Sequence, residues 1–189
     1  MIRNLDPILT NAQPGQAIQL ERGLYTTMGV TSAQVESQSG PQLKPGVSLV
    51  GHPGGTTILC TRAHDGPEVS VLYGNGDAIS VSDLIVDCGQ SSTPTNKRNG
   101  VYLLGKSSVV SGVGVRRSWG CYANMRESFG ISVSSKREDG SKISECSVSD
   151  IAGDYQTAIQ GYSVQGCAVE FPSEQKPGFR VAYNVGDSS

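Results

Sequence analysis

A six-residue pattern that occurs four times constrains the fold of this 189-residue chain more than any other feature. Each copy has an aliphatic residue, two small or polar residues, an apolar residue, one further residue and Val. The copies occupy residues 81–86, 110–115, 143–148 and 164–169, and their first residues are 29, 33 and 21 positions apart. Repeats of this length that are rich in β-branched residues and Gly are typical of solenoids, in which each coil stacks on the previous one.

A fainter pattern of small and aliphatic residues precedes the later copies, at residues 99–103, 129–133 and 157–160. Each coil is therefore expected to hold two or three short strands, with insertions at the polar corners between them. Because no strong helical pattern separates the strands, the sequence predicts an all-β fold, a right-handed single-stranded parallel β-helix. A β-sandwich is the alternative, since Asn99-Gly100 and Asp139-Gly140 are dipeptides typical of hairpins. A sandwich, however, has no reason to repeat its sequence.

A single domain is predicted, with an N-terminal cap, a body of stacked coils and a C-terminal end or edge. Within the domain 1–189, these three parts are residues 1–15, 16–170 and 171–189. Residues 6–12 of the cap have a weak helical pattern with Pro7 in the first turn. Residues 26–42 are polar and are expected to form a loop. The chain is either a compact solenoid or a piece of a longer one.

The composition excludes some classes of partner. Charged residues make up 17% of the chain and the net charge is −2, whereas a nucleic-acid-binding surface would need a clustered basic excess. No apolar run approaches the roughly 20 residues that a membrane span needs. The first residues also lack the apolar stretch of a secretory signal. Either the protein is not exported by that route or the chain begins after a removed leader.

Five cysteines are distributed along the chain without a CxxC pair, so the spacing of a zinc site is absent. Cys146 and Cys167 occupy the position that Leu84 and Val113 take in the other copies of the repeat. They should therefore stack in the core as small apolar residues with free thiols. Neighbouring coils about 4.8 Å apart would also allow a disulfide between them, which is the alternative.

Three segments near the N-terminus resemble the opening of pectin-lyase-like right-handed β-helix proteins. They are residues 17–25, which end in Gly-Leu-Tyr, residues 43–51, which contain Pro-Gly-Val-Ser-Leu-Val-Gly, and residues 57–59, Thr-Ile-Leu. The later coils resemble the repeats of the same superfamily, so the resemblance covers residues 16–170. It implies a long face of parallel strands that holds an extended polysaccharide, and a location outside the cell or on its surface.

That superfamily contains lyases and hydrolases of acidic polysaccharides as well as phage tailspikes and surface adhesins. The active-site motifs of its polygalacturonases and epimerases are absent here, and the nearest fragment, Gly51-His52-Pro53-Gly54, matches half of one motif. No catalytic residue can therefore be transferred by motif. His52 and His64 are both expected to be ordinary loop residues.

The aligned repeats predict a candidate site instead. The residues directly after the final Val should face outward in one row about 4.8 Å apart; they are Asp87, Arg116, Ser149 and Glu170. Arg117 and Asp150 stand one position later. Arg116 or Arg117 would bind a substrate carboxylate, while Asp87 and Asp150 would act as acid and base or hold a Ca²⁺ ion. The alternative is a ladder of solvated charges that keeps this face soluble.

Aromatic side chains near this row would extend the site. Trp119 and Tyr122 follow Arg117 in an expected corner, and Tyr155 follows Asp150. Sugar rings stack on aromatic faces, so the expected substrate-binding residues are Trp119, Tyr122, Tyr155 and Glu170. Trp119 would equally serve to cover the end of a strand.

Two functions stay open from the sequence. One is a polysaccharide lyase or glycoside hydrolase that acts on an acidic polysaccharide, with Ca²⁺ as the one candidate cofactor. The other is a non-catalytic β-helix that binds glycans or forms part of a phage tail or surface adhesin, for which a homotrimer is expected. A groove in which Arg and two carboxylates converge would favour the enzyme, because the fold alone favours neither function.

Overall fold

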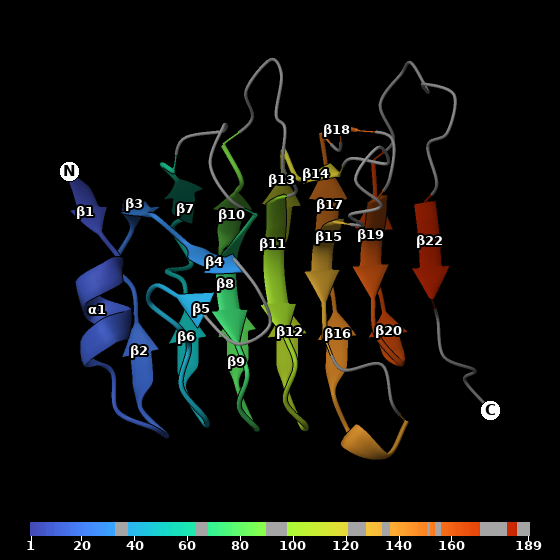
Figure 1. Cartoon of the computed structure of the whole chain (residues 1–189), viewed down its shortest axis with the longest axis horizontal. Helices are drawn as coiled ribbons and strands as arrows, with labels where there is room; N and C mark the ends of the chain where they lie inside the picture. The colour runs from blue at the N-terminus through green and yellow to red at the C-terminus, as the bar shows by residue number, and fades with distance from the viewer. Residues whose placement is uncertain are drawn as a thin grey trace.

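The computed structural model describes residues 1–32, 38–62, 68–89, 98–120, 128–133, 137–150, 152–153, 156–170 and 181–184. Strands make up 50% of it and helices 6%, and parallel strands stack into a β-solenoid (Figure 1). This architecture confirms the parallel β-helix that the repeat predicts and excludes the β-sandwich. Each coil passes through three sheets, named A, B and C below.

The repeat begins in sheet B and ends in sheet A. Sheet A has seven strands, in the order β1 (Ile2–Asn4), β3 (Gly23–Thr27), β7 (Thr56–Cys60), β10 (Ile85–Asp87), β13 (Gly114–Arg116), β17 (Ser147–Ser149) and β21 (Ala168–Val169). Sheet B has six, in the order β2 (Ala17–Gln19), β6 (Ser48–Val50), β9 (Ser80–Ser82), β12 (Val109–Ser111), β16 (Lys142–Ser144) and β20 (Ser163–Gln165).

Sheet C has nine strands, most of them in a single row. The row is β22 (Val181–Asn184), β19 (Gln156–Gln160), β15 (Ser128–Ser132), β11 (Arg98–Leu103), β8 (Val69–Gly74), β4 (Val30–Ser32) and β5 (Gln38–Ser39). Off this row, β14 (Trp119–Gly120) pairs with β11 and with β18 (Ala152–Gly153).

Among the described residues, five consecutive coils have a parallel partner in all three sheets: β6-β7-β8, β9-β10-β11, β12-β13-β15, β16-β17-β19 and β20-β21-β22. The first coil differs, because β4 runs antiparallel to β8 and forms a hairpin with β5. The loop expected over residues 26–42 is therefore partly strand. At the other end, β22 pairs in parallel with β19, so the stacking continues beyond Glu170.

Equivalent positions of the repeat stack on one another in successive coils. The residues that open each copy stack in sheet B, and the final Val residues stack in sheet A. The same columns extend to Ile18 and Leu49 in sheet B and to Tyr25 and Ile58 in sheet A. The pattern misses these members because their corners are longer: Leu49 and Ile58 are nine positions apart, against five in the four copies.

In the later coils, one residue with positive φ turns the chain from sheet B into sheet A. These corner residues are Asp83 (58°), Gly112 (61°), Glu145 (54°) and Gly166 (62°). The corners stack through backbone hydrogen bonds, such as the N–H of Asp83 donating to the Ser111 carbonyl at 3.1 Å. Acidic residues and Gly therefore alternate along this column, and Gly adopts the conformation at little steric cost.

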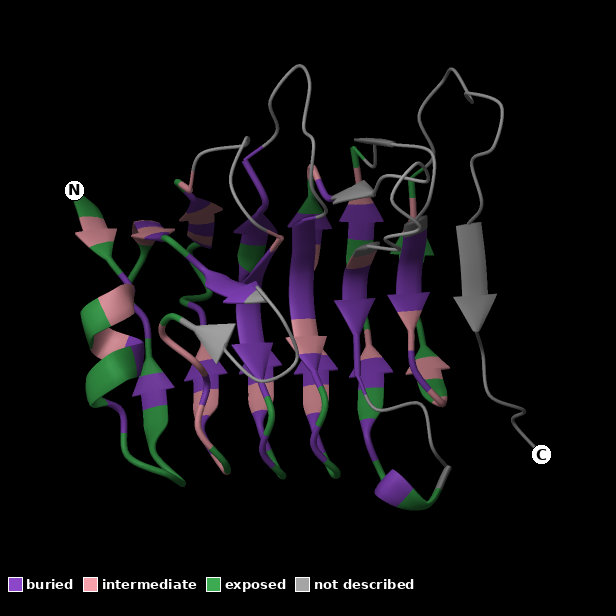
Figure 2. Ribbon diagram, in the orientation of Figure 1, coloured by how far each residue is buried: buried purple, intermediate pink, exposed green. Residues whose placement is uncertain are grey.

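The buried apolar residues form one continuous core. Figure 2 shows that buried residues occur along the stacked strands. Cys146 is buried and Cys167 is half-buried against this core, and both are free thiols, as predicted. Burial raises the pKa of the Cys146 thiol to about 11. Cys146 therefore fills its place in the column as a neutral apolar group, as Leu84 and Val113 do in theirs.

A short helix closes the N-terminal end, which confirms the predicted cap. It is α1 (Asp6–Asn11), with Pro7 in its first turn and Leu9 packed into the core. Strand β1 pairs with β3 at the edge of sheet A, which the sequence pattern does not indicate. A 3₁₀ turn, η2 (Arg137–Asp139), precedes β16. In the part of the chain that the structure describes, no helix has the length and apolar character needed to cross a membrane.

Candidate functional site

Two columns of residues face outward from sheet A. The first is uncharged and consists of Leu24, Thr57, Ile85, Gly114, Ser147 and Ala168. The second lies two residues further along each strand and consists of Thr26, Leu59, Asp87, Arg116 and Ser149. Asp87, Arg116 and Ser149 thus lie side by side in the row that the sequence predicts. Glu170 follows the last strand of the sheet, where its N–H donates to the Val148 carbonyl at 2.9 Å.

Two arginines hold the carboxylate of Asp87 between them. Arg116 Nε donates to Asp87 Oδ2 at 2.8 Å. Arg117 Nε and Nη2 lie 2.6 and 2.5 Å from Oδ1, which also accepts the N–H of Gly89 at 3.0 Å. Only 3% of the Asp87 side chain is exposed. Both oxygens of this buried carboxylate therefore have hydrogen-bond donors.

This arrangement argues against Asp87 as a catalytic base. A general base needs an oxygen lone pair within reach of the substrate, and both Asp87 oxygens are engaged in a buried ion pair. The two arginines, which we name the arginine edge, are more open, with 45% of the Arg116 and 36% of the Arg117 side chain exposed. Two guanidinium groups beside one carboxylate leave a net positive charge at this edge.

Behind the arginine edge lies a buried group of polar side chains. Arg98 is buried and donates from Nη1 to Cys60 Sγ at 3.0 Å and from Nη2 to the Arg62 carbonyl at 2.9 Å. Burial raises the pKa of the Cys88 thiol far above its usual range, so that thiol stays neutral. The Ser118 hydroxyl is also buried and has no partner within the described part of the chain. None of these side chains offers an exposed contact to a large ligand.

Asp150 does not meet Asp87. It follows Ser149, which is stacked two coils away from Asp87, so the two acidic residues are about 10 Å apart along the solenoid. Ca²⁺ needs six or more oxygen ligands, and these two carboxylates alone do not bring them together. Among the described residues, no group of three or more His, Cys, Asp or Glu side chains is placed to hold a metal ion.

The predicted aromatic contacts of Trp119, Tyr122 and Tyr155 stay predictions. Trp119 is in β14, where its backbone pairs with Arg98 of sheet C, and Tyr122 and Tyr155 lie outside the described residues. A different set of rings stacks on sheet C: the ring centroid of Tyr102 lies 5.9 Å from that of Tyr73 and 5.5 Å from that of Phe129. Tyr73 and Tyr102 hold equivalent places in successive coils, which the faint second pattern does not indicate because it begins after Tyr73.

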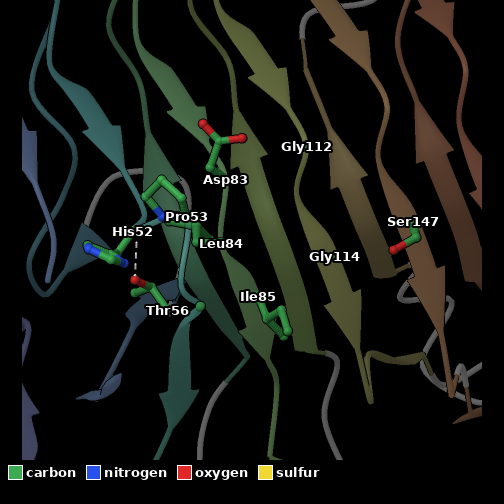
Figure 3. A pocket seen from close by; sticks show the side chains of 10 residues that line it. His52, Pro53, Thr56, Asp83, Leu84, Ile85, Gly112, Gly114 and Ser147 are labelled. Carbon is green, nitrogen blue, oxygen red and sulfur yellow. Dashed lines mark hydrogen bonds between the residues drawn. The ribbon is translucent and has the colours of Figure 1, made fainter. Parts of the chain in front are cut away.

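A trough with a volume of about 520 Å³ opens on the outer face of sheet A, at the start of its strands (Figure 3). Ile85, Gly114 and Ser147 of the uncharged column line its floor. Ile85 is 40% exposed and gives the floor an apolar patch. Gly114 has no side chain, so the floor is lowest between its two neighbours in the column.

The longer corner between β6 and β7 forms one wall of the trough. His52, Pro53 and Thr56 line it, and Figure 3 shows them beside the floor. Thr56 Oγ1 accepts the N–H of His52 at 2.9 Å, and His52 Nδ1 accepts the N–H of Gly54 at 2.8 Å. His52 is a loop residue, as expected, and it also lines the trough. No repeat predicts this wall, because its corner departs from the repeat length.

Two exposed carboxylates, Asp83 and Glu145, form an acidic rim along the corner column. A Cβ atom placed on Gly112 would lie 2.8 Å from Asp83 Oδ1, so the Asp83 carboxylate extends over the next coil. A Cβ atom placed on Gly166 would lie 3.7 Å from Cγ of Glu145, which is the same arrangement two coils later. Neither carboxylate has an ion-pair partner among the described residues. Asp83 and Glu145 are the third residues of the copies at 81–86 and 143–148, so the aligned repeats could have indicated this acidic rim.

Comparison with models of known protein families, with curated proteins and with solved structures finds no match to this chain. The fold defines the chain as a parallel β-solenoid, while the resemblance to pectin-lyase-like proteins stays a prediction.

Proposed function

We propose that this solenoid binds an acidic polysaccharide on the outer face of sheet A, with Arg116 as the main contact to the carboxylates of the polymer. The proposal depends mainly on the exposure and the hydrogen bonds of the Arg116 side chain. It is 45% exposed and uses Nε toward Asp87, while Nη1 and Nη2 have no other partner among the described residues. A planar guanidinium group binds a carboxylate through two parallel hydrogen bonds, which suits these two nitrogens.

The neighbours of Arg116 favour a ligand that lies flat on the sheet. Gly114 precedes it by two residues on the same strand, and Ser149 stacks beside it in the next coil. These residues are small, so no bulky side chain separates the arginine edge from the trough. An extended polymer could therefore contact both features at once.

Binding without cleavage is the better-supported activity. A lyase needs a base within hydrogen-bond reach of the proton beside the substrate carboxylate. The acidic residue nearest to Arg116 in the row is Asp87, and its oxygens are occupied by the two arginines and by the N–H of Gly89. Asp150 lies outside the row, one position after Ser149 of the next coil. The homotrimer implied by a tail or adhesin function stays a prediction.

Calorimetric titration with polyuronate chains, with and without Ca²⁺, tests the proposal. Arg116→Gln should weaken binding by about tenfold or more, because it removes a charged bidentate contact. Lys142→Gln removes the same charge from an exposed position on sheet B and is the matched control. Its affinity should stay within about twofold of the wild type.

Two results would contradict the proposal. Equal affinities of the wild type and Arg116→Gln would remove Arg116 from the site. An absorbance increase from unsaturated sugar product during the titration would show a lyase instead of a binding protein. Arg117 still holds Asp87 in the Arg116→Gln variant, so an unchanged thermal melting curve is the expected check on folding.

A further inference from the structure

We infer that the trough on sheet A receives an uncharged, hydroxyl-rich sugar beside the acidic sugar held by Arg116. This inference rests on the proposed function and narrows its substrate class. The polymer recognised would carry neutral and acidic units next to each other, and a chain of acidic units alone would bind less well.

The charge distribution across the face supports this inference. The acidic rim, Asp83 and Glu145, lies where the strands of sheet A begin, and the arginine edge lies where β13 ends. Asp83 lines the trough, and its carboxylate has no ion-pair partner among the described residues. A second carboxylate placed in the trough would be repelled by Asp83, whereas sugar hydroxyl groups can donate hydrogen bonds to it.

The lining of the trough also suits a sugar ring. Pro53 and Ile85 offer apolar surface to the carbon face of a ring, while the exposed Ser147 contributes a hydroxyl group. Apolar surface with a few polar groups placed around it is the usual composition of a small-ligand site, and a volume of about 520 Å³ lies in the usual range.

The spacing of the two features fits neighbouring units of one polymer. Gly114 on the floor and Arg116 at the edge are two residues apart on β13, which corresponds to about 7 Å. A ring over Gly114 and a carboxylate on Arg116 therefore belong to adjacent parts of one ligand. Any side chain at position 114 would occupy the place of the ring.

The test compares three probes by calorimetric titration: a uronate homopolymer, a polymer that alternates uronate with neutral hexose, and a neutral gluco-oligosaccharide. The wild type should prefer the alternating polymer over the homopolymer by about fivefold or more. Asp83→Asn keeps the shape of the side chain and removes its charge. It should reduce this preference to about twofold or less, mainly by improving the binding of the homopolymer.

Gly114→Val tests the floor of the trough. A Cβ atom at this position would lie 3.4 Å from Ser147 Oγ and 3.7 Å from Ile85 Cγ1, so the fold should accept a side chain that then fills the trough. Binding of the alternating polymer and of the neutral oligosaccharide should each fall by about tenfold. Ser163→Val adds similar bulk to an exposed position on sheet B and should change neither affinity.

The outcomes separate this inference from the function on which it rests. If the homopolymer binds as tightly as the alternating polymer, or if Asp83→Asn leaves their ratio unchanged, the inference is wrong while acidic-polymer binding stands. If Arg116→Gln affects neither polymer but Gly114→Val still abolishes neutral-sugar binding, the proposed function is wrong while the sugar site stands. A protein that binds none of the three probes contradicts both.

Discussion

Asp83 and Asp87 are four residues apart on one coil, yet their surroundings are opposite. Asp87 is buried between two guanidinium groups, whereas Asp83 is exposed with a φ of 58°. The difference lies in the next coil, which places Arg116 beside Asp87 and Gly112 beside Asp83. In a solenoid, the residue stacked on a side chain determines its role more than its neighbours in sequence do.

The largest expected difference is in the free energy of unfolding after the matched substitutions Asp87→Asn and Asp83→Asn. Asp87→Asn removes the charge that two arginines share and turns an amide N–H₂ toward their donors. The free energy of unfolding should fall by about 2–3 kcal/mol, at the low end for a buried pair because both arginines are partly exposed. Asp83→Asn should change it by less than about 0.5 kcal/mol. Urea denaturation measures both values.

A double variant sharpens this test. In the Arg116→Gln background, Asp87→Asn should lower the free energy of unfolding by less than it does in the wild type, because one of the two ion pairs is already absent. If Asp83→Asn and Asp87→Asn lower the free energy of unfolding by equal amounts, the contrast between the two residues is wrong.

The buried residue after one of the corners, Cys146, gives a pH-dependent effect of intermediate size. Glu145-Cys146 is the equivalent of Asp83-Leu84, and burial raises the pKa of Cys146 from 9.0 to about 11. The folded state therefore favours the neutral thiol, and the stability this contributes is complete below pH 9 and lost as the pH rises toward 11. The free energy of unfolding should fall by up to about 1 kcal/mol per pH unit in this interval.

Cys146→Val is the control for the alkaline effect, because Val113 fills the same position in the previous coil. This variant should have nearly the wild-type stability at pH 7 and a flatter decline above pH 9. A decline as steep as that of the wild type would assign the effect to other groups, such as the Cys88 thiol, whose pKa burial also raises.

Replacing the corner residue Asp83 by Gly should give a small gain in stability. Asp83 has a φ of 58°, and the equivalent corners have Gly at this position, as Gly112 and Gly166. The Asp83→Gly variant would therefore have the same residue type as these corners. Relief of left-handed backbone strain should raise the free energy of unfolding by about 0.5 kcal/mol, after part of the gain is offset by the freer unfolded chain. Thermal denaturation of Asp83→Gly and Asp83→Val measures it, and Val should destabilise. A more stable Val variant would show that the corner is not strained.

The fold was predictable because the tight corners keep the repeat at one length. Where a corner has the constant length, as between Val110 and Val115, the sequence pattern indicates which residues face inward. Where four residues are added, between Leu49 and Ile58, the same stacking exists but the pattern is lost. The hairpin of β4 and β5 was missed for a related reason, because antiparallel strands lie outside the repeat.

The candidate site was predictable only as a row of residues. Alternation along the strand places Asp87 beside Arg116, but it does not indicate that Arg117 also turns toward the same carboxylate. That contact depends on the positive φ of Arg117, 60°, which a repeat pattern does not encode. The trough was not predictable, because its wall comes from a corner that is longer than those of the repeat.

The corner column from Gly51 through Asp83, Gly112, Glu145 and Gly166 has a period of two coils. Like charges along it are therefore about 10 Å apart, close to the Debye length at physiological salt, instead of about 5 Å. Duplication of one acid-bearing coil would place two carboxylates on neighbouring coils, where their repulsion is much less screened. The alternation of acidic residues with Gly therefore keeps the electrostatic cost of stacking these corners low.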